Sequence, residues 1–366
     1  MDKRSFLKQL TLTAGSLYFL PQTGWGKTDK MNSKNWIWIH NKKWTNEEWR
    51  SRLSSLKEIG IDGILLGENH RLFERLFPIV DDLEMELHAW MWTMNRPNDP
   101  VALKHPDWYA VNRNGLSTYK KENRPYVDYY QWLCPSNEEV ISYLEERVEK
   151  LCQMEKLQGV HLDYVRYPDV ILPKALQSNY GLVQDKEFPE FDYCYCPTCQ
   201  AKFKKEYGED LSKMKDPSVS KEWKQFRYDR ITKAVNRLAS ITNKHSKMLT
   251  AAVFPHPDKA REIVRQSWDD WNLDAVFPMI YYNFYGQGVP WVGSSTKKGV
   301  RALKNHSTNR ALYSGLYLPE LKTESDFLQA VKISLKNGAK GVAVFDYNSL
   351  KPHHRKVFKQ LTASDL

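Results

Sequence analysis

The stretch GVHLDYVRYPD, residues 159–169, carries the strongest indication of the fold. It starts as a short apolar run, typical of a buried strand, and that run ends at Asp163. Side chains alternate in direction along a strand, so His161 and Asp163 point to the same side. A buried strand that ends on a carboxylate and continues into Tyr164 and Arg166 is typical of the carboxyl edge of a parallel sheet, where polar side chains gather.

Similar strands recur along the chain, separated by amphipathic segments. The first such segment starts with a predicted capping box of Thr45 and Glu48 and stops at Gly60. The strands are apolar throughout, as in parallel sheets covered on both faces. Eight β/α units in roughly 335 residues predict an α/β fold, a (β/α)8 TIM barrel. The expected strands are residues 35–40, 63–67, 85–93, 159–163, 248–254, 273–282, 311–318 and 341–347.

An open doubly wound sheet is the alternative fold. It has no support from the sequence, because the first strand is followed by HNKKW and not by a glycine-rich fingerprint. A phosphate-binding loop motif is also absent from the sequence, so we do not expect nucleotide binding. We expect residues 29–366 to form a single barrel domain, with long insertions at about 94–135 and 164–220.

Residues 1–28 have the layout of a bacterial export signal. A basic start is followed by an apolar stretch over residues 10–20 and then by small and turn-forming residues. The segment KRSFLK resembles a twin-arginine signal with Lys in place of the first Arg. The sequence therefore predicts a periplasmic or extracellular protein, and it indicates no particular oligomeric state.

The charge distribution argues against two classes of partner. The formal net charge is +10, from 54 basic and 44 acidic residues, but no Lys/Arg block or nucleic-acid-binding motif occurs. No apolar run approaches the roughly 20 residues that span a bilayer. We expect neither nucleic-acid binding nor a membrane span. The excess of basic residues indicates a solvated surface or a preference for acidic glycans.

Three of the five cysteines form a C-x-C-x-x-C cluster, residues 194–199. A complete zinc site needs four ligands, so a fourth would have to come from elsewhere in the chain. A local disulfide is the favoured interpretation, and a structural metal site or free thiols remain open. Cys152 lies on a predicted helix and is expected to be a core residue. The cluster members are Cys194, Cys196 and Cys199, and the remaining cysteine is Cys134.

Seven segments together are typical of one protein family: ELHAWMW (86–92), HPDWYAVNRNG (105–115), WLCPSNEEV (132–140), GVHLDYVRYP (159–168), CYCPTCQAKF (194–203), LDAVFPMIYY (273–282) and GVAVFDY (341–347). They resemble the bacterial family-10 glycosyl-hydrolase-like proteins. The resemblance implies an exported (β/α)8 barrel that hydrolyses glycosidic bonds without a cofactor. More distantly, HLD at 161–163 resembles the R-x-D of the α-amylase superfamily, whose Asp is the nucleophile. His161 replaces that Arg and the fifth strand lacks the acid/base Glu, so the mechanism is not carried over whole.

Glycoside hydrolysis normally needs two carboxyl groups, one that donates a proton and one that attacks or activates water. Asp163 is the first candidate, kept ionised by neighbouring positive groups. Glu320 is the favoured second catalytic residue, and Glu68 and Asp346 also follow strand ends. The structural alternatives are pairing of Asp163 with Arg166 or His161, pairing of Glu68 with Arg71, capping of a turn by Glu320, and bonding of Asp346 to loop amides.

Sugars present apolar C–H faces and a belt of hydroxyl groups, so their sites combine aromatic platforms with polar side chains. Such residues cluster at several predicted strand ends. Barrel packing is the alternative role for the tryptophans, and a hydrogen-bonded interior position is the alternative for His88. His256 is a weaker candidate of the same kind. The expected substrate-binding residues are Glu68, His88, Trp90, Trp92, His161, Tyr164, Arg166, Tyr281, Tyr282, Asn283 and Asp346.

The leading interpretation is an exported glycoside hydrolase acting on a poly- or oligosaccharide. A non-catalytic glycan-binding barrel would use the same residues for capture only. A metal-dependent carbohydrate deacetylase is less favoured, because no H-x-H or H-E-x-x-H pair occurs and we expect no catalytic metal.

Overall fold

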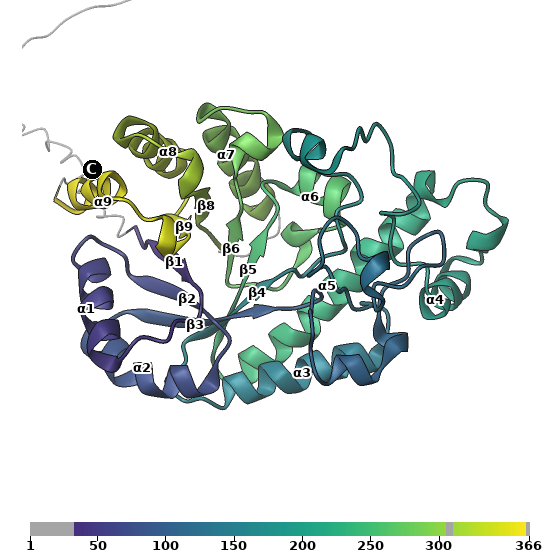
Figure 1. Ribbon diagram of the computed structural model, residues 1–366, viewed down its shortest axis with the longest axis horizontal. Helices are drawn as coiled ribbons and strands as arrows, with labels where there is room; N and C mark the ends of the chain where they lie inside the picture. The colour runs from purple at the N-terminus through teal and green to yellow at the C-terminus, as the bar shows by residue number, and fades with distance from the viewer. Residues whose placement is uncertain (1–32, 305–309, 364–366) are drawn as a thin grey trace, which may run out of the picture. The chain divides into compact units, whose positions relative to one another are not determined.

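Parallel pairing continues from strand to strand around the centre of the fold (Figure 1). The computed structural model describes residues 33–304 and 310–363, which all fall within one compact unit. The expected export signal, residues 1–28, lies outside the described residues. The strands are β1 (Trp36–Ile39), β2 (Gly63–Gly67), β3 (Glu86–Trp92), β4 (Gly159–Asp163), β5 (Met248–Val253), β6 (Ala275–Pro278), β7 (Ala311–Leu312), β8 (Ser314–Tyr317) and β9 (Val342–Phe345).

The segment 311–317 closes the ring, because its two short strands pair with different neighbours. β7 pairs with β6 and β8 pairs with β9, and only Tyr313 separates them. A further parallel bridge joins Met279 to Gly315, next to a 2.9 Å bond from the Ile280 amide to the Gly315 carbonyl. β7 and β8 are therefore one interrupted barrel strand, and the predicted (β/α)8 barrel is confirmed.

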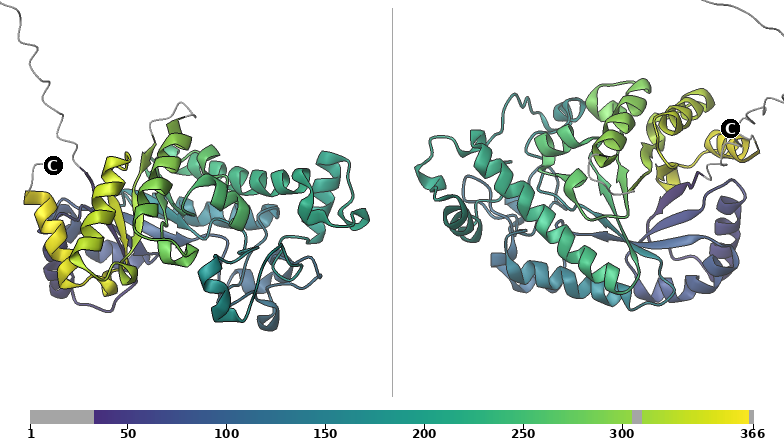
Figure 2. Two further views of the ribbon diagram at one scale, coloured as in Figure 1. Left: turned by 90° about the horizontal axis from the view of Figure 1, so that it is seen from above. Right: turned by 180° about the vertical axis from the view of Figure 1, so that it is seen from behind.

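Helices surround the ring, as the views from above and from behind show (Figure 2). α1 starts at the predicted capping box, in which the Glu48 amide donates to the Thr45 hydroxyl at 3.2 Å and the Thr45 amide donates back at 2.8 Å. None of the described helices is long and apolar enough to cross a bilayer. The helices are α1 (Asn46–Lys57), α2 (His70–Asp82), α3 (Glu138–Cys152), α4 (Pro197–Tyr207), α5 (Lys221–Lys244), α6 (Pro257–Val264), α7 (Pro290–Lys304), α8 (Glu324–Lys336) and α9 (Pro352–Ala363).

Large aromatic side chains fill the barrel interior. The ring of Phe277 lies edge-on to Trp36 and to Trp38, with centroids 5.5 Å and 6.1 Å apart. Gly63 makes room for this packing, since a Cβ at that position would lie 2.3 Å from the Trp36 ring. The interior is thus a packed core, and space for a ligand opens only beyond its last layer at the carboxyl ends of the strands.

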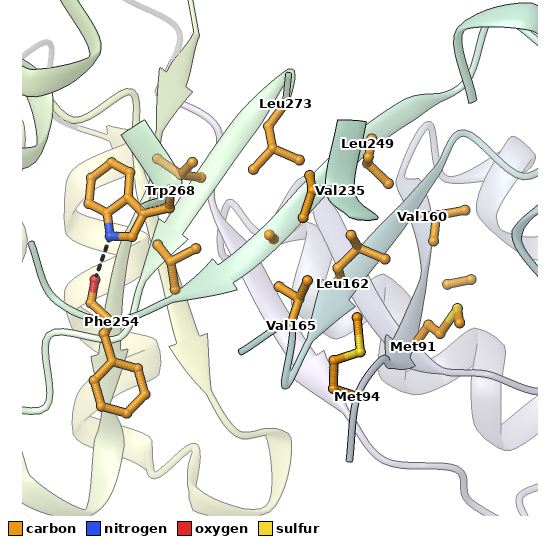
Figure 3. Packing of buried hydrophobic residues seen from close by; sticks show 14 of the residues in the cluster. Met91, Met94, Val160, Leu162, Val165, Val235, Leu249, Phe254, Trp268 and Leu273 are labelled. Atoms are coloured by element: carbon orange, nitrogen blue, oxygen red, sulfur yellow. Dashed lines mark hydrogen bonds between the residues drawn. The ribbon is translucent and has the colours of Figure 1, made fainter. Parts of the chain in front are cut away.

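A second apolar layer lies between the strands and the helices (Figure 3). Leu162 of β4 and Leu249 of β5 belong to the same buried cluster as Val235 of α5. Trp268 joins this layer, and its indole N–H donates to the Phe254 carbonyl at 3.1 Å. β4 therefore sends Leu162 outward and its neighbours on either side inward, as the period of two predicted.

Two helices flank the sixth strand. α6 ends at Val264, because Arg265 adopts a left-handed conformation with φ of 58°. Gly293 and Gly299 weaken the helical pattern of α7, but Gly299 leaves room for packing, since a Cβ there would lie 2.7 Å from a terminal methyl of Leu312 in β7.

The long segments after β3 and β4, predicted as insertions, pair with each other near the carboxyl ends of the strands. Asn112 and Tyr193 form an antiparallel bridge. The Tyr195 amide donates to the Val111 carbonyl at 2.7 Å, and the Arg113 amide donates to the Asp192 carbonyl at 3.0 Å. The two loops therefore form one connected wall beside the barrel mouth.

Replacing Phe277 by Ala should lower the free energy of unfolding by about 3–5 kcal/mol, because it opens a cavity among fully buried rings. Val219→Ala is the control: that side chain is 72% exposed, and its loss should stay within about 0.5 kcal/mol. Chemical denaturation of both variants measures the difference. Similar losses for the two variants would contradict a tightly packed barrel interior.

Candidate active site

A cavity of about 520 Å³ opens beyond the last interior layer of the barrel. Its floor includes Trp38 and Asp163, which come from strands, and its walls include Tyr130 and Leu176 from the two long loops. Most of the other lining residues are aromatic. The cavity therefore presents a carboxylate among aromatic rings, and its volume is within the range of small-molecule binding sites.

Asp163, the last residue of β4, lines this cavity and is partly buried. One carboxylate oxygen accepts a 2.9 Å hydrogen bond from the Trp90 indole N–H, and the other accepts a 2.6 Å bond from the Tyr164 amide. Tyr164 has a φ of 50°, a strained value that is uncommon outside glycine. Burial raises the pKa of Asp163, and these two N–H donors oppose the rise.

Arg166 does not pair with Asp163, the structural alternative that the sequence left open. Its guanidinium donates to Asp169 at 3.0 Å and to the Tyr167 carbonyl at 2.9 Å, and it lies 4.8 Å from the centroid of the Trp132 ring. Arg166 and Asp169 both line the cavity. Arg166 is thus hydrogen-bonded to another carboxylate, and its charge opposes the rise in the pKa of Asp163 less than the two N–H donors do.

The expectation that His161 and His88 lie at the mouth with Asp163 is corrected by the structure. Both side chains are fully buried in the barrel interior, one layer or more below the cavity. His161 Nδ1 lies 2.9 Å from the Thr250 hydroxyl and His88 Nδ1 lies 3.4 Å from it. Burial lowers the pKa of His88 to about 3, so both roles are those of neutral interior histidines. His256 is also buried, and it is not among the residues that line the cavity.

The predicted aromatic residues divide between the cavity and the surrounding core. Trp90, Trp92, Tyr164 and Tyr281 line the cavity, and the rings of Trp92 and Tyr164 lie 4.7 Å apart. Tyr282 instead turns away and donates its hydroxyl to the Glu320 carbonyl at 3.0 Å. Four of the predicted aromatic side chains therefore line the cavity.

Glu320 does not line the cavity and is 8% exposed, but its charge acts on Tyr281 and Tyr317, which do line it. Within the described residues, the carboxylate of Glu320 accepts one hydrogen bond, from the Asn283 backbone amide to Oε2 at 3.3 Å. Its other oxygen, Oε1, is buried and accepts none from these residues. Burial raises the pKa of Glu320 to about 7. The Asn283 side chain itself is exposed and does not line the cavity.

The phenol of Tyr281 is influenced by the charges of several carboxylates in this region. Burial raises the pKa of Tyr281 well above its usual value, and the charges of Asp163, Glu320 and Asp346 raise it further. Its ring centroid lies 5.1 Å from that of Tyr317, which also lines the cavity. One phenol therefore stands close to three candidate acids that come from three different strand ends.

The carboxylates of Asp346 and Glu68 form hydrogen bonds or ion pairs with neighbouring residues. Asp346 accepts bonds from the Ser349 amide at 3.2 Å and hydroxyl at 2.9 Å, which is the loop-amide role considered from the sequence. Glu68 forms an ion pair with Arg147 and not with Arg71, the alternative that the sequence left open. Its second carboxylate oxygen lies 3.7 Å from a guanidinium nitrogen of Arg96. Glu68 lines a neighbouring cavity of about 430 Å³.

Several lining residues were not identified from the sequence. His40 borders both cavities, and its ring lies 4.8 Å from the Trp90 ring. Tyr129 and Tyr130 belong to the VDYY segment, whose aromatic content was a usable signal. Phe345 precedes the candidate acid Asp346 and faces the cavity from β9.

The cysteines lie apart from the cavity. Within the described residues, the one group of three or more His, Cys, Asp or Glu side chains with metal-ligand spacing is Cys134, Cys194, Cys196 and Cys199. All five cysteines are free thiols, so the favoured disulfide is not present.

No family model and no curated protein matches the sequence. Solved structures do match. The β-galactosidase of the haloarchaeon Halorubrum lacusprofundi aligns with a TM-score of 0.65 at 12% identity, over 90% of this chain and 57% of that one. A GH42 β-galactosidase from G. stearothermophilus gives 0.61 at 12% identity, over 90% and 56%.

A β-amylase catalytic domain from Paenibacillus polymyxa aligns with a TM-score of 0.60 at 12% identity, over 89% of this chain and 97% of that domain. The chain thus spans little more than half the length of the two β-galactosidases and nearly all of the β-amylase domain. At these identities the comparisons establish the barrel fold that glycoside hydrolases share.

The raised pKa of Glu320 predicts a pH-dependent stability. A folded-state value of about 7, against the ordinary 4.5, means that the folded protein keeps a proton that the unfolded chain releases. The wild type should therefore lose stability as the pH rises from 4.5 to about 7. Relative to the wild type, Glu320→Gln should gain a few degrees in Tm over that range, measured by thermal melts.

Glu324→Gln is the matched control. The Lys356 ammonium lowers the pKa of Glu324, so this carboxylate is charged in the folded and in the unfolded chain over most of that pH range, and the Tm difference for Glu324→Gln should stay nearly constant there. A Tm difference for Glu320→Gln that does not change with pH would show that Glu320 titrates normally.

Proposed function

We propose that this chain is an exported glycoside hydrolase that acts on a poly- or oligosaccharide. The observation that carries the proposal is Asp163, a hydrogen-bonded carboxylate at the end of β4 that lines an aromatic cavity in the barrel mouth. The barrel fold shared with known glycosidases is consistent with it. Membership of the family-10-like proteins and export, which the sequence suggested, are parts of the same proposal.

Asp163 is assigned as the carboxylate that attacks the anomeric carbon or activates water. Both of its oxygens accept N–H bonds, and such bonds favour the charged form over the protonated form. The lone pairs that remain free are in a cavity wide enough for a sugar ring. A carboxylate that is held by two donors and still faces a cavity is suited to this role.

Glu320 is assigned as the proton donor. A glycosidase needs a second carboxyl group with a raised pKa, so that it still carries a proton near neutral pH. The pKa of about 7 meets this requirement, because burial of Glu320 is offset by only one long hydrogen bond. Its proximity to Tyr281, which Asp163 also influences, supports action on the same substrate.

The aromatic lining supports a saccharide substrate. Trp92, Tyr164 and Tyr129 form a run of rings with centroids 4.7 Å and 6.1 Å from Trp92. Ring faces pack against the C–H faces of sugars, while Arg166 and Asp169 supply polar contacts nearby. This mixture favours a carbohydrate over a wholly apolar ligand.

A non-catalytic glycan-binding barrel is the second candidate. The observation that favours it is the place of Glu320, which is buried and is not among the residues that line the cavity. A single free carboxylate in the cavity is sufficient for capture of a sugar, but hydrolysis needs two.

Asp163→Asn should decide between the two candidates. In a hydrolase, kcat should fall by at least about 10³-fold, roughly 4 kcal/mol of transition-state stabilisation, because the amide cannot attack or accept a proton. Substrate affinity and Tm should change little. The measurements are reducing-end release from a panel of glycans, calorimetric binding of the same oligosaccharides, and thermal melts.

The control is Asp274→Asn, at the opposite end of the barrel, where that carboxylate also accepts a backbone bond, from the Leu249 amide at 2.7 Å. This variant should keep full turnover. If the wild type binds oligosaccharides but releases no reducing ends, the binding candidate is correct and the hydrolase proposal is lost.

Tyr129→Ala tests the sugar platform. Tyr129 is 45% exposed at the rim, so its loss should cost little stability while raising KM about tenfold, or ~1.4 kcal/mol of binding. The comparison is Tyr228→Ala on α5, away from the cavity. Equal KM values for both variants would remove Tyr129 from the site.

A further inference from the structure

Four cysteines from two distant segments meet at one buried point. Cys134 ends the long loop after β3, and Cys194, Cys196 and Cys199 lie in the loop after β4. Their four sulfur atoms all lie within 4.8 Å of one another. The side chains are 0–4% exposed. This cluster supplies the fourth ligand that the C-x-C-x-x-C motif alone lacks.

The sulfur spacing fits a metal ion better than a disulfide. Cys134 Sγ lies 3.4 Å from Cys196 Sγ and 3.5 Å from Cys199 Sγ, whereas a disulfide bond is about 2.05 Å long. Zn–S bonds of about 2.3 Å in a tetrahedron place neighbouring sulfurs about 3.8 Å apart. The four thiols are thus gathered at nearly the spacing that one tetrahedral ion requires.

Hydrogen-bond donors already face these sulfurs. The Val111 amide donates to Cys194 Sγ at 3.3 Å, and the Cys199 amide donates to Cys196 Sγ at 3.5 Å. The Cys199 thiol donates to the Ser136 hydroxyl oxygen at 3.1 Å, and this hydroxyl can donate in return once the thiol is a thiolate. Donors of this kind stabilise thiolate ligands and orient them, as outer-shell partners of metal sites do.

We propose that Cys134, Cys194, Cys196 and Cys199 bind one structural Zn²⁺ ion as thiolates. All four positions of the tetrahedron are then protein ligands, which is the arrangement of a structural and not a catalytic zinc site. Soft thiolates in a tetrahedral S₄ set select zinc over hard cations such as Mg²⁺ or Ca²⁺. The proposal does not depend on the reaction proposed for the cavity.

The ion ties together the two loops that wall the cavity. Cys134 is bonded through its amide to Trp108 in the first loop, and Cys196 caps the start of α4 in the second. The two loops also contact each other through the stacked rings of Tyr126 and Phe191, whose centroids lie 4.4 Å apart. Because the ligands are far apart in sequence, metal binding is coupled to folding of the wall.

The test is the metal content of the full-length protein, purified without chelators and analysed by inductively coupled plasma mass spectrometry. We expect one zinc per chain. Cys134→Ser should lose the zinc and lower the Tm by about 5 °C or more. Cys152→Ser is the matched control, because Cys152 is equally buried on α3 but is not part of the cluster, and it should keep the zinc.

A measurement on the wild type covers the case in which Cys134→Ser fails to fold. A mercurial thiol reagent should release one zinc per chain into a chromogenic chelator, in step with four modified thiols. A metal-free protein with reduced thiols that takes up no added zinc would overturn the proposal. So would disulfides among these cysteines in the denatured mass, or iron in place of zinc.

Discussion

The parallel register between β3 and β4 is the constraint on which the site depends. It pairs Trp90 with His161 and Trp92 with Asp163, so both strands bring their last residues to the same level. Because side chains alternate, His161 and Asp163 face the same side one layer apart. Ring closure then seals the lower layer and leaves the upper one open, which separates a buried histidine from a carboxylate that reaches the cavity.

Three acids in or near the cavity, Asp163, Asp169 and Glu320, differ in how their charge is compensated. Asp163 accepts two N–H bonds, Asp169 has the Arg166 guanidinium, and Glu320 has one long bond from a backbone amide. A buried carboxylate without compensation favours its protonated form. The raised pKa of Glu320 therefore follows from burial with a single long hydrogen bond, and this is why we propose Glu320 as the proton donor.

The two long loops turn the end of a barrel into a cavity. They supply Tyr130 and Leu176 to its walls, and backbone pairing between Asn112 and Tyr193 holds them to each other. The cysteine cluster lies within the same joined region. The hydrogen bonds between the two loops restrict their backbone before any ligand binds. Less conformational entropy is then lost when a ligand enters the cavity, so the loop side chains can be held in place for it.

The sequence by itself determined the barrel, its long loops, the position of Asp163 at a strand end and the aromatic character of the mouth. These follow from the local pattern of apolar residues, and alternation along a strand needs no knowledge of distant segments. Only the tertiary structure decided that Arg166 pairs with Asp169, that His88 and His161 are interior, that Glu320 acts on Tyr281 without lining the cavity, and that Cys134 joins the other three cysteines. Arg166 and Asp169 are only three residues apart, but the path of the loop after β4 decides which carboxylate the guanidinium reaches. The other three outcomes depend on strands and loops that meet although they are far apart in the chain, and no local pattern encodes such contacts.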